Sequence, residues 1–83
     1  MNLVVITPDS TLFDGEVASS TFPGAKGSFQ VLNSHAPLIS ALEQGVVKYQ
    51  PLEGNEASIT ISGGVVEVVD NSITVLVESV IEE

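Results

Sequence analysis

The sequence has no cysteine and no arginine, and only one histidine and two lysines among its 83 residues. Without cysteine no disulfide can staple the fold, and a single histidine leaves no cluster of residues with metal-ligand spacing. The longest aliphatic run near the start, residues 3–6, is far too short to span a membrane, and no basic region precedes it. We therefore expect a soluble chain that works where it is made, with neither a signal or transit peptide nor a structural metal.

Positive charge is scarce, and the formal net charge is −9. Nucleic acids and anionic lipid surfaces are bound mainly through basic side chains, so the composition disfavours nucleic acid and direct lipid insertion. The acidic balance favours a partner with a basic surface, or serves only for solubility. A domain of this size buries roughly 60–65% of the surface that its unfolded chain exposes. We therefore expect a tight β core, a docking partner, or both.

Apolar and β-branched residues recur along the chain in short runs, which predicts strands and no helix. Turn signals recur about every eight to twelve residues, as in a sandwich or small barrel. The sequence thus predicts one all-β domain of about seven to nine short strands. The main runs lie at residues 2–7, 16–21, 28–32, 46–50, 58–62, 65–69 and 72–77, with shorter apolar pieces at 11–13 and 37–42.

Turn residues and alternation refine this pattern. Asp14-Gly15 predicts a turn before the second long run, in which Val17, Ser19 and Thr21 are expected to share one face. Two further dipeptides interrupt the later strands. The paired glycines Gly63-Gly64 suggest a bulge or a close backbone approach. Asp70-Asn71 fits a two-residue hairpin turn.

Residues 22–42 are the least periodic part of the sequence and the richest in turn formers. One turn is predicted around Lys26 and another around His35, with a single short strand between them. Because loops at the edge of a sheet often carry recognition, these two loops, which lie close together in sequence, are the first place to look for a site.

No set of residues predicts catalysis. His35 is the only side chain that titrates near neutral pH without help, and Ser34 beside it does not make a nucleophile and base. The carboxylates are scattered along the chain. Neither Gly24-x-x-Gly27 nor the later glycine pair has the spacing of a phosphate-binding loop or opens a helix. We expect no catalytic residue, no nucleotide or metal site, and no cofactor.

Lys26 carries one alternative. It weakly resembles the modified lysine of lipoyl and biotinyl carrier domains, which are also small, acidic and all-β. In those domains the lysine lies at a hairpin tip near mid-chain, usually beside an acidic residue or methionine. Here Ala25 and Gly27 flank it, and it lies in the first third of the chain. A carrier domain modified on Lys26 remains the second hypothesis.

Segments along nearly the whole chain resemble the N-terminal β-sandwich domain of the F-type ATP synthase epsilon subunit. The HAPLI segment is the most specific of them, and the order and spacing of all the segments carry the resemblance. They are LVVITP at 3–8, LFDGEV at 12–17, FPG at 22–24, GSFQVL at 27–32, HAPLI at 35–39, Leu42-x-x-Gly45, ISGGVVEV at 61–68 and ITVLVE at 73–78.

This resemblance implies a ten-stranded sandwich without chemistry of its own, placed in the central rotor between the gamma subunit and the membrane-embedded c-ring. Together, pattern and resemblance predict a flattened β-sandwich of about eight to ten short strands over residues 1–83. The resemblance also implies a location at the cytoplasmic face of the bacterial inner membrane. It assigns Thr7, His35, Leu38, Ser40 and Leu42 to the gamma side, and Ala25, Lys26, Ser28 and Phe29 to the c-ring side. His35 is expected where the two interfaces meet.

The sequence departs from the family in two places. Many relatives carry an acidic residue where Ser28 stands and Pro-Gly where Asn33-Ser34 stands, which puts a charge contact to the c-ring through Ser28 in doubt. The family also usually continues into a C-terminal helical hairpin that can inhibit ATP hydrolysis. Since this sequence stops at Glu83, we expect it to lack that hairpin.

Overall fold

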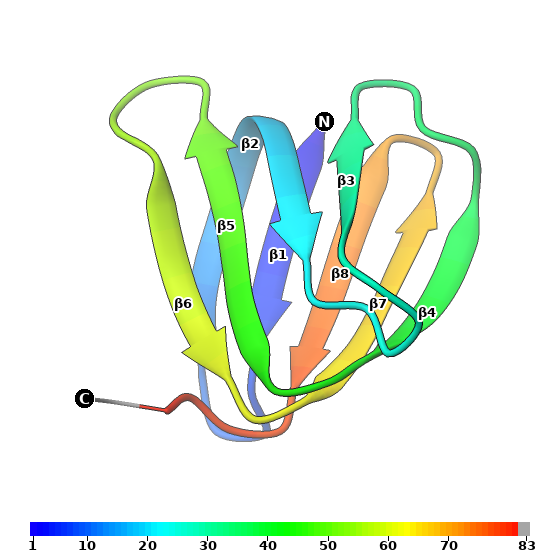
Figure 1. Ribbon diagram of the computed structural model, residues 1–83. Coiled ribbons are helices and arrows are strands. Elements are labelled where there is room, and N and C mark those ends of the chain that lie inside the picture. The colour runs from blue at the N-terminus through cyan, green and yellow to red at the C-terminus, as the bar shows by residue number, and fades with distance from the viewer. Residues whose placement is uncertain (82–83) are drawn as a thin grey trace.

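The second strand, β2 (Thr11–Phe22), is the longest of the fold and belongs to both of its sheets. The computed structural model describes residues 1–81, which form eight strands and no helix (Figure 1). The other strands are β1 (Asn2–Ile6), β3 (Phe29–Leu32), β4 (Leu38–Leu42), β5 (Gly45–Pro51), β6 (Ala57–Ile61), β7 (Gly64–Val69) and β8 (Ser72–Val77). The expected β-sandwich is therefore confirmed.

Two sheets pack face to face through this shared strand. The first sheet has the strand order β4-β7-β8-β1-β2, and the second consists of β2, β5 and β6 with β3 on the other side of β2. All pairs are antiparallel except β1 with β8. Two isolated bridges, Gly24 with Leu42 and Ile61 with Val80, link the edges of the sheets. Leu42 and Ile61 are the last residues of β4 and β6, whereas Gly24 and Val80 lie outside the eight strands.

The core is made of alternate residues on the inner faces of the two sheets. On β8, for example, Ile73, Val75 and Val77 are buried, and the residues between them point outward. Burial of the Tyr49 ring, which lies 4.6 Å from Phe13 between ring centroids, raises the pKa of its phenol above the ordinary value. The buried apolar residues are Leu3, Val5, Val17, Phe22, Val31, Leu42, Val47, Tyr49, Ile61, Val66, Val68, Ile73, Val75 and Val77.

The turn predicted at Asp14-Gly15 is wrong, because β2 runs through both residues. Asp14 pairs with Val4 and Gly15 with Leu3. An Asp-Gly dipeptide favours a hairpin only when the flanking strands fold back on each other, whereas here β1 offers a continuous partner. Glycine is still useful at this position, since a Cβ on Gly15 would lie 3.2 Å from Cζ of the Phe13 ring.

The prediction that Val17, Ser19 and Thr21 share one face of β2 is also wrong. The register of β2 shifts between Val17 and Ser19, so that the buried positions are Val17, Ser20 and Phe22 rather than Val17, Ser19 and Thr21. A bulge inserts one residue and moves every later side chain to the opposite face. The bulge lies where β2 passes from one sheet to the other.

This shift leaves a serine in the core. Ser20 is 1% exposed, pairs with Val31 and Tyr49, and its hydroxyl has no hydrogen-bond partner. Replacing it by alanine removes an unsatisfied polar group, so Ser20→Ala is expected to raise the free energy of unfolding by about 1 kcal/mol in urea denaturation. The control, Ser58→Ala on the exposed side of β6, is expected to change it by less than about 0.5 kcal/mol. A loss of stability in Ser20→Ala would show that the hydroxyl is needed.

Candidate interaction site

The outward side of the first sheet carries an exposed apolar surface, here called the outer face. Ile39, Leu76 and Val65 are 72%, 52% and 41% exposed. Pairing places Ile6, Leu76, Val65 and Ala41 in one row across β1, β8, β7 and β4, with Ile39 in the next row. Single exposed apolar residues are ordinary, but a contiguous group on one sheet face marks a surface for contact.

Two shallow hollows shape the outer face. The larger, about 600 Å³, is lined by Ile6, Thr7, Pro8, Gly64, Val65, Leu76, Val77 and Glu78. The smaller, about 150 Å³, is lined by Ile39, Val65, Glu67, Thr74 and Leu76. Val65 and Leu76 line both hollows, so the hollows adjoin each other. Together they form one shallow depression that can receive side chains of a partner.

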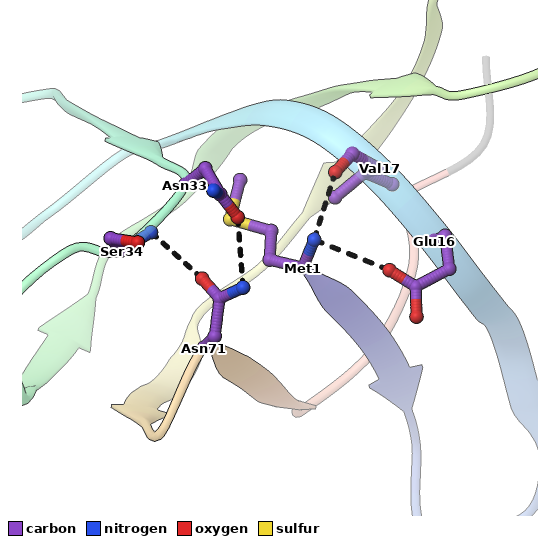
Figure 2. Close-up of polar contacts among 6 residues, drawn as sticks. All are labelled: Met1, Glu16, Val17, Asn33, Ser34 and Asn71. Carbon is purple, nitrogen blue, oxygen red and sulfur yellow. Dashed lines mark hydrogen bonds and ion pairs between the residues drawn. The ribbon is translucent and has the colours of Figure 1, made fainter.

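The charge on the outer face is acidic. Glu67 lies among the apolar residues, and Asp14 and Glu16 lie at the β2 side of the sheet. Figure 2 shows the ion pair between the Glu16 carboxylate and the Met1 amino group, in which Oε2 lies 3.2 Å from the nitrogen. It is the one ion pair among residues 1–81. Both lysines lie elsewhere, Lys26 between β2 and β3 and Lys48 on the outward side of the second sheet. A partner that covers the outer face therefore meets several carboxylates, of which Glu16 is paired with the Met1 amino group and Glu67 with no basic side chain of the described residues.

The residues assigned to the gamma side on β4 point inward. Leu38, Ser40 and Leu42 pair with Val68, Val66 and Gly64, and Leu42 is 6% exposed while the other two are half-buried. Their neighbours Ile39 and Ala41 point outward and are not among the residues that the resemblance assigns to the gamma side. The signal that finds them is the strand alternation, once the pairing of β4 with β7 fixes which side is the core.

Thr7 lies at the other side of the outer face, where the chain turns from β1 to β2. Its backbone N–H and its hydroxyl both contact Ser10, whose carbonyl oxygen lies 2.9 Å from the N–H. The side chain is half-buried and lines the larger hollow. Of the five residues assigned to gamma, Thr7 is thus the one that lines the larger hollow of the outer face.

The loop around Lys26 is a tight turn fixed to the end of β4. The Gly27 N–H donates to the Gly24 carbonyl at 3.0 Å, and Gly27 has a φ of +127°, which favours glycine. The Ala25 N–H donates to the Ala41 carbonyl at 3.0 Å. Ala25, Lys26 and Ser28 are exposed, whereas Phe29 is half-buried with its ring 5.7 Å from that of Phe22. The three exposed residues are accessible to a partner, and Phe29 anchors the loop through its contact with the Phe22 ring.

The turn that carries His35 is held by the β7–β8 hairpin. Figure 2 shows the Asn71 side chain accepting a hydrogen bond from the Ser34 N–H and donating one to Oδ1 of Asn33, both at 2.8 Å. Ser34 and Asn71 both have positive φ, 64° and 62°. His35 is half-buried, and its Nδ1 lies 2.7 Å from the Ala36 carbonyl oxygen. This turn is therefore ordered by contacts made far along the chain.

The two loops do not form one site. They lie at opposite ends of β3, so that the Lys26 loop is at one end of the sandwich and the His35 turn at the other (Figure 1). Although the loops lie close together in sequence, the four residues of β3 are extended and separate them. The described residues contain no helix long and apolar enough to cross a membrane and no group of three possible metal ligands.

The described residues thus form a small β-sandwich with an exposed apolar outer face and two ordered loops. The family model "ATP synthase, Delta/Epsilon chain, beta-sandwich domain" matches residues 1–83. The chain belongs to this family.

Curated relatives and solved structures are similar to the chain over nearly its full length. The ATP synthase epsilon chain of Nitratiruptor sp. is 42% identical over 81 residues, which are 98% of this chain and 63% of that protein. The epsilon chain of Chlorobium limicola is 41% identical over 78 residues, 94% of this chain and 89% of that protein. The chain thus spans less than two thirds of the length of several relatives that it matches.

Two mitochondrial ATP synthase structures have the same fold. A chain in the central stalk and c-ring structure from Tetrahymena thermophila superposes with a TM-score of 0.84 at 20% identity, covering 98% of this chain and 65% of that one. A chain from the Euglena gracilis enzyme gives 0.87 at 23% identity, covering 95% and 51%. None of these matches supports the carrier-domain hypothesis for Lys26.

Proposed function

We propose that the chain is a non-catalytic central-stalk subunit of an F-type ATP synthase that joins the gamma subunit to the c-ring. The observation that carries this proposal is the contiguous apolar outer face, on a domain whose family is that of the epsilon chain. A standard interface buries about 800 Å² per partner. The chain exposes 4832 Å², so one such contact covers about a sixth of its surface.

In this proposal the gamma subunit covers the outer face. Ile39, Val65 and Leu76 form the centre of the contact, and Thr7 lies beside them at the larger hollow. Leu38, Ser40 and Leu42 act from the inner side of β4 by holding Ile39 outward, and His35 contacts gamma at the far end of the strand.

The c-ring meets the opposite end of the sandwich from His35 in this proposal. Ala25, Lys26 and Ser28 make the contact, with Phe29 fixing their loop against Phe22. The subunit then belongs to a membrane-associated complex at the cytoplasmic face of the bacterial inner membrane, and it couples ring rotation to the gamma shaft without binding nucleotide, metal or cofactor itself.

Co-expression with the gamma subunit of the same organism, followed by gel filtration, tests the proposal. We expect the two chains to elute together as a one-to-one complex. Elution of this chain alone, while gamma is folded, would contradict the proposed role and leave only the shared fold. An intact-mass measurement on the same sample is expected to show no lipoyl or biotinyl group on Lys26.

A further inference from the structure

Glu67 is a carboxylate in the middle of the apolar outer face. On β7 it lies between Val65 and Val69, and it is in register with Ile39 on β4 and Thr74 on β8. Its exposed side chain lines the smaller hollow together with Ile39, Val65, Thr74 and Leu76. Among residues 1–81 no basic side chain pairs with it.

This position has a consequence when a partner covers the face. In the free chain the Glu67 carboxylate is hydrated, so its apolar neighbours do not lower the stability of the fold. In a docked complex it loses water, and a buried carboxylate without a cation offsets much of the stabilisation that burial of its apolar neighbours gives. An apolar face with a central carboxylate therefore fits a partner that brings a positive charge to that point.

We infer that the partner on the outer face places a long basic side chain, lysine or arginine, opposite Glu67. The aliphatic stem of that side chain packs on Ile39, Val65 and Leu76, and its charged end reaches the carboxylate in the smaller hollow. The Thr74 hydroxyl, in register with Glu67, is placed to accept a further hydrogen bond. The inference rests on the proposed function, and it makes Glu67 a determinant of partner choice rather than of stability.

Isothermal titration of the gamma subunit into the full chain tests this inference with a matched pair of variants. Glu67→Gln keeps the size and hydrogen-bond acceptor of the side chain but removes its charge. Glu56→Gln removes the same charge from the exposed loop between β5 and β6, away from the outer face. We expect Glu67→Gln to weaken binding at least about tenfold and Glu56→Gln less than about twofold, because only the first charge is desolvated in the complex.

Salt and charge reversal sharpen the test. Between about 50 mM and about 300 mM salt, affinity of the unsubstituted chain is expected to fall more steeply than that of Glu67→Gln, because one ion pair is missing in the variant. Glu67→Lys is expected to weaken binding more than about a hundredfold, since like charges then oppose each other. If the melting temperature of each variant is unchanged, the loss of affinity comes from a lost contact with gamma and not from unfolding of the variant.

The outcomes separate the inference from the proposed function. If the unsubstituted chain binds gamma and Glu67→Gln binds equally well or more tightly, no cation lies opposite Glu67 and the inference is overturned while the proposed function stands. If the unsubstituted chain does not bind gamma at all, the proposed function fails and the inference falls with it.

Discussion

Replacing Gly64 by alanine is expected to lower the free energy of unfolding by at least about 3 kcal/mol, a large share of the roughly 5–15 kcal/mol of a typical domain. Gly64 pairs with Val77 on one side and Leu42 on the other. A Cβ there would clash with the Leu76 carbonyl oxygen and lie 3.2 Å from Cα of Val77. Both are backbone atoms of a paired strand, so the clash is relieved only by separating β7 from β8. Urea and thermal unfolding measure the loss.

The neighbouring glycine provides the control. A Cβ on Gly63 would meet Oε1 of Glu78 at 3.2 Å, which is the movable end of a side chain, and the Leu42 carbonyl at 3.4 Å. Gly63→Ala is therefore expected to cost less than about 1 kcal/mol. Equal losses in the two variants would contradict the idea that close approach of β8 requires glycine at position 64. The paired glycines predict either a bulge or a close backbone approach, and the structure shows the close approach.

Replacing Ile39 by aspartate is expected to weaken binding of the gamma subunit at least about a hundredfold, because the change places a charge at the centre of an apolar contact. Ile39 is 72% exposed in the free chain, so the melting temperature is expected to stay nearly the same. Isothermal titration and gel filtration with gamma measure the two effects separately.

Leu52 is a suitable control for this change. It is 64% exposed, similar in size, and follows the end of β5 in the loop between β5 and β6, outside the first sheet. Leu52→Asp adds the same charge and is expected to change binding less than about twofold. If both substitutions weaken binding equally, the effect comes from net charge, and the outer face is not the docking surface.

The parts of the fold that depend on local signals could be predicted from the sequence. The strand at Ser72–Val77 and the hairpin turn before it are as expected, because alternation fixes the face and Asp70-Asn71 adopts the left-handed φ values, 50° and 62°, that a tight hairpin needs. The exposed loop around Lys26 follows from its glycines and proline in the same way.

The parts that depend on distant pairing could not. Whether Asp14-Gly15 turns or continues is decided by β1, and the inner face of β2 is decided by a bulge that no local pattern marks. The same holds for the candidate site. Ile39 and Leu38 are both apolar and adjacent, and only the pairing of β4 with β7 shows which of them faces a partner. The support of the His35 turn by Asn71, 37 residues away from Ser34, is likewise invisible in sequence.

The parallel pairing of β1 with β8 also determines when the domain can fold. These strands lie side by side in the centre of the first sheet, although Asn2 and its partner Ser72 are separated by nearly the whole described chain. Closing so long a loop is entropically unfavourable, and domains dominated by such non-local pairs fold in milliseconds to seconds rather than microseconds. During synthesis β1 is made before the other strands, and it cannot pair with β8 until almost all of residues 1–81 have been made. Until then the apolar edge of β1 is open to other chains, so the nascent domain is most vulnerable to aggregation before β8 arrives.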